Sequence, residues 1–410
     1  MSDQSQRVFE GIKVLEFCWL IVGPYTTKFF ADHGATVIKV ESATRVDYLR
    51  SMMPFKDGQP GLNRSIFFGY YNTGKLSLAL NLRKAEGRDL LHRLIERWQP
   101  DVLVESFAPG SMDRLGLGYD DLRKIKPDII YYSTTQLGQT GPFARYVGVG
   151  NISSGLAGLN EITGWPDRAP IGPKVALPDT INPPLGVTAI IAALEYRRRT
   201  GKGQRIDVSQ VEGCLLFEAA ALLDYAVNGR VAGRCGNRDP SMAPHGVFPC
   251  AGDDRWIAIA VRNDTDWKAL CQMAVGEPWV ADARFATLKG RQESEDDLEA
   301  SIALWTSSQD ADTLTLRLQE AGVPAAPVKD ALDIVRDPQL NHMRFFRQAE
   351  HAECGPMPYD APSFALSRTP GDIRAAPVVG QHNGQILKDI VGLSDDQIAE
   401  LIVAGVVESP

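Results

Sequence analysis

The first 135 residues alternate short apolar runs with segments whose apolar residues recur at helical spacing. The strand-length apolar runs fall at 12–17, 36–40, 101–104 and 129–133. Helical spacing is clearest at Tyr25, Phe29 and Phe30 after the first run, and over Leu90–Trp98 before the third. Strands that alternate with helices are typical of βαβ units and of a mostly parallel sheet with helices on both faces. We therefore predict an α/β fold for this part of the chain.

The middle of the chain predicts a long helix, a strand and a second helix. Apolar residues recur with helical period over 183–199, and the basic run Arg197–Arg199 followed by Gly201 favours a helix end at that point. A strand is expected at 204–208. The capping-box pattern that follows this strand predicts a helix over 209–228.

A second, smaller unit is predicted after a break at 229–246 that is rich in glycine, arginine and proline. It would contain a strand at 256–261, helical segments to about Ala321 and a proline-rich exit at 323–328. Beyond this exit the chain is expected to be largely irregular until a helix at 394–403. Because 410 residues exceed one ordinary hydrophobic core, the length agrees with two or three domains.

Composition narrows the classes of protein to which the chain can belong. Hydrophobic residues make up 44% and charged residues 23%, which is typical of a folded globular chain and excludes a disordered one. The net charge of −8 argues against a general nucleic-acid binder but leaves room for a local basic pocket. No apolar run approaches the roughly 20 residues of a membrane span. We therefore expect neither nucleic acid nor a membrane among the partners.

The cysteines, the histidines and the first residues indicate a cytoplasmic protein without a metal site. The six cysteines are scattered and form no CxxC pair, as in reduced cytosolic chains. The six histidines fall in no common ligand spacing, so no metal is expected. The polar first seven residues lack the apolar stretch of a signal peptide.

Three common ligand-binding or catalytic motifs are missing from the sequence. The glycines of 110–118 do not follow the GxGxxG spacing of dinucleotide-binding loops, and no phosphate-binding P-loop pattern occurs. No GxSxG nucleophile elbow is present, which disfavours a serine hydrolase.

Asp179 is the most informative acidic residue, because it lies a few residues before the helix expected at 183–199. The unpaired N–H groups and the positive dipole of a helix start favour an ionised carboxylate there. Asp179 can be interpreted as a helix-capping acid, which is the commonest use of aspartate at that position. It can also be interpreted as a carboxylate nucleophile, which must be ionised and held in place. Composition leaves both interpretations open, and the flanking motifs decide between them.

Ordered motifs from Gly11 to about Val403 resemble a single enzyme family. They are GIKVLEF at 11–17, GP at 23–24, ADHGATVIKVE at 31–41, NTGKLSL at 72–78, VESFAPG at 104–110, DRLG at 113–116, GQTGP at 138–142, RTGKGQ at 199–204, GVP at 322–324 and VGQH at 379–382. The chain resembles the family III CoA-transferases, which include formyl-CoA, carnitine and benzylsuccinate CoA-transferases and the related 2-methylacyl-CoA racemases. The resemblance implies a Rossmann-like large CoA-binding domain over 1–225 and 330–410, a smaller inserted α+β domain over 226–329, and an interlocked dimer.

The resemblance also implies covalent chemistry at Asp179, which falls on the family's nucleophilic aspartate. The carboxylate would attack the thioester of a donor acyl-CoA, giving an aspartyl acyl anhydride, and the released thiolate would then form an aspartyl-CoA thioester. An acceptor carboxylic acid would finally take over the CoA. Coenzyme A is thus implied as substrate, and exchanging one thioester for another requires no metal.

Eight further residues fall on stretches that contact CoA in the family. They are Ser42, Leu80, Asn81, Arg83, Ser106, Phe107, Ala108 and Arg114. Arg114 matches a family arginine, whose planar guanidinium suits bidentate phosphate binding. Its alternative interpretation is a surface arginine in an ordinary salt bridge.

The donor, the acceptor and the partner are expected from smaller details. Ile21 replaces the glutamine that formyl-CoA transferases carry before the Gly-Pro turn, and the glycine-rich lid of those enzymes is missing after Arg234. An aromatic or branched acceptor acid such as benzylsuccinate is therefore expected. Succinyl-CoA is the expected donor. Trp19, Leu20 and Ile21 either line an acyl pocket or belong to the core.

A racemase is the main alternative function, but the segment 146–151 lacks the histidine and aspartate that would move the proton. The partner is expected to be a second copy in a homodimer or a related subunit in a heterodimer, the chain then being one subunit of a hetero-oligomeric CoA-transferase.

Overall fold

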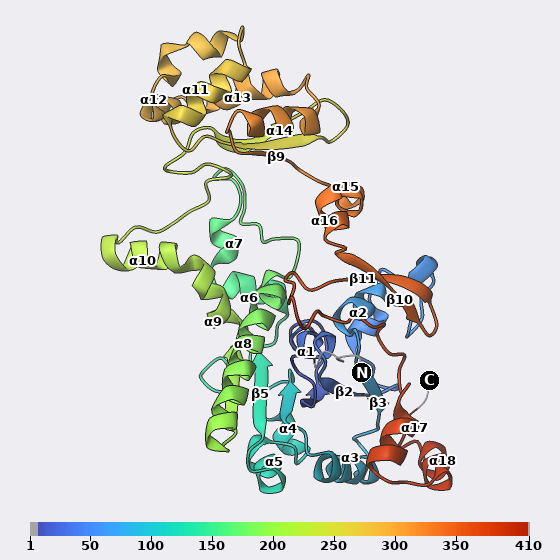
Figure 1. Cartoon of the computed structure of the whole chain (residues 1–410). Coiled ribbons are helices and arrows are strands. Elements are labelled where there is room, and N and C mark those ends of the chain that lie inside the picture. Colours follow the sequence, from blue (N-terminus) through green and yellow to red (C-terminus); the bar gives the residue numbers. More distant parts are fainter. Residues whose placement is uncertain (1–6, 409–410) are drawn as a thin grey trace. The chain divides into compact units, whose positions relative to one another are not determined.

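The computed structural model describes residues 7–408, which form two compact units (Figure 1). The large unit takes its residues from three stretches of the chain, within 1–160, 172–231 and 341–410. The small unit takes its residues from 161–171 and 232–340. The small unit is therefore inserted, along the sequence, between parts of the large one.

A parallel sheet organises the large unit. Over residues 7–408 its six strands follow the order β3-β2-β1-β4-β5-β6, and each neighbouring pair runs parallel. The strands are β1 (Lys13–Phe17), β2 (Thr36–Glu41), β3 (Leu76–Ala79), β4 (Val102–Glu105), β5 (Ile130–Thr135) and β6 (Gln204–Ser209). The strand order reverses between β1 and β4, as in doubly wound nucleotide-binding sheets. The predicted α/β fold with a mostly parallel sheet is confirmed.

Helices cover both faces of this sheet, because successive residues of each strand point to opposite faces and both sets are apolar. Leu15 of β1 packs into the core that contains α3 (Ala85–Trp98). Its neighbour Val14 packs into a second core with α1 (Val22–Asp32) and α8 (Leu177–Thr200). The predicted helix at 90–98 is confirmed within α3, whose apolar residues Leu90, Leu91, Leu94, Ile95 and Trp98 are all buried.

Shorter helices connect these elements. They are α2 (Ile66–Tyr71), α4 (Ser111–Arg114), α5 (Tyr119–Ile125), α6 (Gly150–Leu156), α7 (Leu159–Ile162), α9 (Gln210–Leu215) and α10 (Ala219–Asn228). The helix predicted over 209–228 is therefore divided in two by a 3-10 turn at Leu216–Glu218. Its predicted start is confirmed, since the Ser209 hydroxyl accepts a hydrogen bond from the N–H of Glu212 at 3.3 Å.

Helix α8 begins earlier than its apolar period predicts. It starts at Leu177 rather than near Pro183, because Pro178 fits the first turn of a helix, where no N–H donor is needed. Pro183 and Pro184 lie inside the helix without ending it. Asp179 therefore lies within the first turn of the helix and not before it.

The C-terminal third is more regular than predicted. Strands β10 (Phe346–His351) and β11 (Gly355–Asp360) form an antiparallel hairpin. Prolines at alternate positions of β11 concealed this strand, although its buried residues, Met357 and Tyr359, also alternate. The helices of this third are α15 (Ala331–Arg336), α16 (Pro338–His342), α17 (Asn383–Gln385) and α18 (Asp395–Val403). The last of them confirms the helix predicted at 394–403.

The small unit has its own sheet and its own core. Its antiparallel sheet has the order β7-β8-β9. The strands are β7 (His245–Pro249), β8 (Trp256–Ala260) and β9 (Ala325–Pro327), and the longer helices are α11 (Asp264–Met273), α12 (Leu288–Glu293), α13 (Glu295–Thr306) and α14 (Ala311–Glu320). The proline-rich segment at 323–328 is thus a strand paired with β8, in addition to being the exit from the helices. Buried side chains such as Ile257, Trp267 and Leu298 fill the space between sheet and helices.

The helices of the structure differ in length and in apolar content. Within residues 7–408, none of them combines the length and the apolar composition that crossing a bilayer requires.

Candidate active site

The carboxyl ends of β1 and β4 mark the point at which the strand order reverses. In open α/β sheets, ligands bind in the crevice outside the strands at such a point. The loops after the two strands are tied together here, since the N–H of Trp19 donates to the Ser106 hydroxyl at 3.2 Å. The rings of Trp19 and Phe107 also meet edge to face, with centroids 5.5 Å apart. The topology therefore makes the surroundings of these two loops the expected position of a ligand.

A buried charge network holds the turn after β1. The ammonium group of Lys39 lies 3.0 Å from a carboxylate oxygen of Glu16 and 3.0 Å from one of Asp47, and all three side chains are fully buried. Although burial alone would raise it, Lys39 and Lys75 lower the pKa of Glu16 to about 2. Asp47 in turn accepts the N–H of Leu20 at 3.0 Å, and Leu20 adopts a left-handed φ of 63° that non-glycine residues rarely take. The strained turn is thus held by ion pairs beneath it.

The residues expected to contact CoA after β2 and β3 lie on loops at this edge of the sheet. The Ser42 hydroxyl has a partner within the chain, because it donates a hydrogen bond to the Glu408 carboxylate at 2.6 Å. Leu80 is buried, at 2% exposure, and pairs with Val407 in an isolated β-bridge. Asn81 accepts the N–H of Arg83 at 3.1 Å, and the side chain of Arg83 is exposed.

The remaining expected CoA contacts follow β4. Ser106 and Phe107 are half-buried beside Trp19, and Ala108 is exposed. Arg114 ends the short helix α4, is exposed, and donates to the Ser111 hydroxyl at 3.0 Å. All eight residues therefore follow the carboxyl ends of β2, β3 and β4, which places them along one edge of the sheet, with β1 between β2 and β4.

Asp179 lies in the first turn of α8 and is buried, at 9% exposure. Burial raises its pKa from 3.8 to about 7, and no charged group contributes to the shift. Ala176, not Asp179, is the N-cap of α8, and no side chain forms a capping hydrogen bond there. The capping interpretation is therefore wrong, and Asp179 is a buried carboxylate that has no ion-pair partner among residues 7–408.

The two prolines inside α8 loosen the backbone around Asp179. Proline has no N–H, so Pro183 and Pro184 cannot donate to the carbonyls of Asp179 and Thr180 four residues earlier. The side chain of Asn182 binds elsewhere, because its amide donates to the Pro178 carbonyl at 2.8 Å and to the Gln210 carbonyl at 3.1 Å. The first turn of α8 is thereby fixed to the start of α9.

Gly150, the first residue of α6, leaves space for the Asp179 carboxylate. A Cβ atom at Gly150 would lie 2.6 Å from Asp179 Oδ2 and 2.8 Å from Ala176 Cβ, which is closer than van der Waals contact allows. The same short segment approaches a second polar group, since a Cβ at Gly148 would lie 2.4 Å from Gln136 Oε1. Sequence reasoning noted only that this segment lacks histidine and aspartate. The alternation of glycines at 148 and 150 was the available signal for a close approach.

Glu105 is a second buried acid that sequence reasoning treated only as part of a motif. It ends β4, is 3% exposed, and burial raises its pKa from 4.5 to about 7. Its carboxylate accepts the N–H of Phe107 at 2.8 Å and the side-chain amide of Gln139 at 3.1 Å. An acid at the end of a fully buried strand was the signal that could have singled it out.

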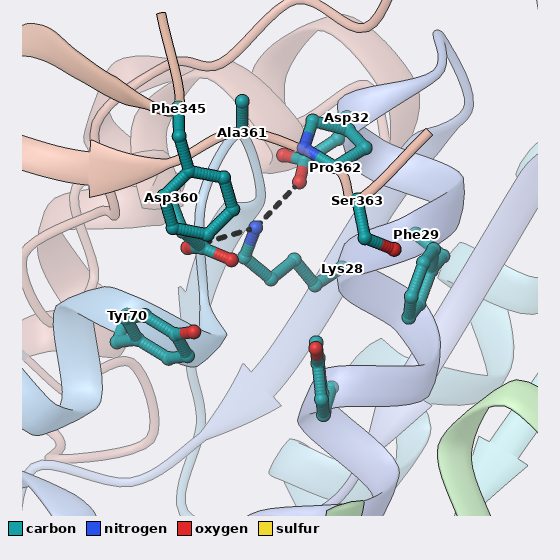
Figure 2. Close-up of a pocket in the computed structure, with 10 residues that line it drawn as sticks. Lys28, Phe29, Asp32, Tyr70, Phe345, Asp360, Ala361, Pro362 and Ser363 are labelled. Atoms are coloured by element: carbon teal, nitrogen blue, oxygen red, sulfur yellow. Dashed lines mark hydrogen bonds and ion pairs between the residues drawn. The ribbon is translucent and has the colours of Figure 1, made fainter. Parts of the chain in front are cut away.

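A pocket beside α1 holds a separate group of buried charges (Figure 2). The Lys28 ammonium points between two carboxylates, at 2.7 Å from Asp32 and 3.4 Å from Asp360. Tyr70 and Phe345 contribute aromatic walls. Because Lys28 bridges Asp32 on α1 and Asp360 at the end of β11, the cluster serves to join these two elements. Within residues 7–408, no group of three or more His, Cys, Asp or Glu side chains is arranged to hold a metal ion.

Comparison with known proteins gives a consistent result. The family model described as CoA-transferase family III matches residues 9–383. Succinyl-CoA–D-citramalate CoA-transferase of Chloroflexus aurantiacus is 32% identical over 402 residues, covering 98% of both chains. Acetyl-CoA:oxalate CoA-transferase of Acetobacter aceti is 36% identical over 81% of this chain and 83% of that one. A CAIB/BAIF family protein from Brucella suis superposes with a TM-score of 0.84 at 31% identity, over 94% of this chain and 100% of that one.

Proposed function

The chain belongs to CoA-transferase family III, and from this premise we propose that it moves CoA from succinyl-CoA to a branched or aromatic carboxylic acid through Asp179. One observation carries the proposal. Asp179 is a buried carboxylate in the first turn of a helix, and neither a capping role nor an ion pair accounts for it. A buried acid that no structural role explains is a candidate for chemistry.

The proposed reaction proceeds through covalent intermediates on Asp179. The carboxylate attacks the thioester carbonyl of the donor, so that the C–S bond breaks and an aspartyl acyl anhydride and CoA thiolate form. The thiolate attacks the aspartyl carbonyl, which releases the donor acid and leaves an aspartyl-CoA thioester. The acceptor carboxylate then displaces the thiolate to give a second anhydride. Attack of the thiolate on the acceptor carbonyl finally yields the new acyl-CoA and regenerates Asp179.

The surroundings of Asp179 suit this role. A carboxylate whose pKa is near 7 is a stronger nucleophile than one at 3.8, and it is still substantially ionised at neutral pH. The missing side chain at Gly150 keeps one side of the carboxylate free of bulk. Burial also keeps water away from an anhydride, which water would otherwise hydrolyse.

CoA is proposed to bind along the loops that follow β2, β3 and β4. These loops and the short helix α4 contain the eight residues from Ser42 to Arg114 named above, and Arg114 carries an exposed guanidinium suited to a phosphate group. The crevice where the strand order reverses is the usual ligand position in such sheets.

An acceptor panel tests the proposal. The purified protein is incubated with succinyl-CoA and, separately, with citramalate, benzylsuccinate, oxalate and acetate, and new CoA thioesters are detected by mass spectrometry. Citramalate and oxalate are included because the relatives from Chloroflexus aurantiacus and Acetobacter aceti are named for them. We expect transfer to the branched or aromatic acids. Absence of transfer to every acid, with succinyl-CoA or acetyl-CoA as donor, would overturn the proposal.

Hydroxylamine provides the matching test of the nucleophile. It converts an aspartyl thioester or anhydride into a hydroxamate, which peptide mass spectrometry locates. We expect the label on Asp179 and none in Asp179→Asn. Deuterium uptake alpha to a 2-methylacyl thioester without CoA transfer would support the racemase alternative instead.

A cytoplasmic dimer is part of the same proposal. Helix α10 has no buried residue, and Leu223, Tyr225 and Val227 on it are each more than 60% exposed. An interlocked second copy would cover such side chains, and a related but different subunit would do so equally. Activity that appears only after mixing with a second chain would favour the heterodimer.

A further inference from the structure

We infer that Glu105 is a positioning residue, whose carboxylate fixes the loop after β4 to the loop after β5 and so shapes the surface on which acyl-CoA binds. The inference rests on the proposed function for the CoA contacts at Ser106–Ala108. The side-chain hydrogen bonds of Glu105 go to Phe107 and Gln139 and not to Asp179, so the proposed role is one of positioning.

One of the two hydrogen bonds that the Glu105 carboxylate accepts lies within the loop after β4. Strand β4 ends at Glu105, and the side chain turns back to accept the N–H of Phe107 at 2.8 Å. This bond closes a short ring of atoms that fixes the direction in which the chain leaves the strand. The Phe107 ring consequently faces Trp19 on the loop after β1, with which it makes the edge-to-face contact at 5.5 Å.

The second hydrogen bond joins Glu105 to the loop after the neighbouring strand, β5. The other carboxylate oxygen of Glu105 accepts the amide N–H of Gln139, 34 residues further along the chain, at 3.1 Å. Gln139 belongs to the turn after β5, and its backbone N–H donates to both oxygens of Asp207 on β6, at 2.9 and 3.1 Å. Gln139 is therefore held from two sides, and Glu105 is joined through it to the third strand of the same edge.

Burial makes the connection rigid. Glu105 is 3% exposed, so water cannot readily replace either donor. Hydrogen bonds to a carboxylate are also stronger than those between neutral groups. Because the two donors come from different loops, loss of the carboxylate would free both loops at once while leaving the strands paired.

The test separates binding from chemistry. We expect Gln139→Ala to weaken CoA binding, measured by titration calorimetry, and to raise the KM for acyl-CoA by about tenfold, which corresponds to the loss of one buried charged hydrogen bond. Glu105→Ala removes both hydrogen bonds and should raise the KM at least as much. The kcat at saturating acyl-CoA should stay within about twofold of wild type, because Asp179 is unchanged. Glu105→Gln should restore most of the binding, since its amide oxygen still accepts the Phe107 N–H and the Gln139 amide can rotate to present its oxygen.

Controls make each outcome decisive. Thr140→Ala changes an exposed residue of the same turn and should leave KM unchanged. If Glu105→Ala fails to fold, Gln139→Ala decides, because Gln139 is only half-buried and the Phe107 bond persists. An unchanged KM in Gln139→Ala, or a fall in kcat alone, would overturn the inference while wild-type transfer continues. Absence of CoA binding by the wild type would overturn the proposed function instead.

Discussion

At Asp179, the ionised form that the proposed chemistry requires is also the form that burial disfavours. Its pKa is 3.8 in an unfolded chain and about 7 in the folded one, so the folded state holds the proton more tightly. Stability associated with this group is therefore greatest below pH 3.8 and is lost as the pH rises through 7. A residue kept under such a penalty is typical of a functional site.

Asp179→Asn should consequently be more stable than wild type but inactive. At pH 8 the variant should unfold at a higher urea concentration, with a gain on the order of 1 to 4 kcal/mol from about 1.4 kcal/mol per pKa unit. At pH 4 the difference should nearly vanish, because the wild-type acid is then protonated in the folded state. Urea unfolding at both pH values measures this, and CoA transfer should fall by at least about 1,000-fold. Equal stability at pH 8 would show that Asp179 is better solvated than its burial indicates.

The rate of transfer should depend on the same ionisation. Only the carboxylate attacks the thioester, so kcat/KM for succinyl-CoA should fall about tenfold for each pH unit below about 7 and level off above it. Steady-state rates between pH 5 and 9 provide the measurement, with circular dichroism to establish that the fold persists at the acid end. A rate independent of pH down to 5 would mean that another group is the nucleophile.

Gly150 should tolerate no side chain. In Gly150→Ala the new methyl group would meet the Asp179 carboxylate at 2.6 Å, so α6 and α8 must move apart and the nucleophile must shift. A displacement of about 1 Å at a reacting group costs about 100-fold in rate, which is the loss that we expect in kcat. Gly155→Ala is the matched control in the same helix, since its methyl group would meet only Asn160 at 3.4 Å. Similar activity in both variants would contradict the proposed geometry.

The elements of the large unit differ in how well the sequence predicts them. The strands near 12–17 and 129–133 are predictable because parallel strands buried on both faces are continuous apolar runs. Strand β3 is only four residues long and is defined by its pairing with β2, which lies far from it along the chain. In β11 two prolines conceal the alternation of buried residues, although its partner β10 directly precedes it. Prediction of the site from the sequence is limited in the same way, because some of its contacts join residues that lie far apart along the chain. Asp179 could be singled out from its surroundings and motifs, whereas the roles of Gly150 and Glu105 depend on partners 29 and 34 residues away.

The packing of α8 against the sheet offers a prediction at the scale of elements. Gly186 brings this helix close to β5, where an added Cβ would lie 2.3 Å from the Tyr132 hydroxyl oxygen. Gly186→Ala should therefore lower the free energy of unfolding by about 1 to 3 kcal/mol, as overpacked cores do. Tyr132→Phe in the same chain should recover part of this loss by removing the crowded oxygen. Urea unfolding measures this, and Gly384→Ala is the control, because a Cβ there meets no atom within 4 Å. If Gly186→Ala were as stable as wild type, the close approach of α8 to β5 would be contradicted.

At the scale of the whole molecule, helix α10 needs stabilisation that its contacts within the described chain do not provide. A ten-residue helix is too short to persist in water by its own hydrogen bonds, and α10 buries none of its side chains within the described chain. Its apolar residues are neighbours on the helix surface, as Leu223 and Val227 are at four-residue spacing. Further exposed apolar side chains of the same unit include Phe143, Tyr146, Val147, Leu216 and Phe217. A partner chain that covers these side chains would supply the missing stabilisation.

The proposed dimer therefore predicts that charges on α10 separate the subunits. We expect wild type to show twice the chain mass in light scattering after size-exclusion chromatography, and Leu223→Glu/Val227→Glu to show the mass of one chain, because burying two carboxylates in an apolar interface is costly. Transfer activity should be lost together with the dimer, since α10 continues from α9, which is fixed to the Asp179 turn through Asn182. Val403→Glu, which changes a 90% exposed valine on α18, should remain dimeric and active. A wild-type monomer that transfers CoA at full rate would contradict the dimer, and a monomer that becomes active only with a second chain would identify the partner as a different subunit.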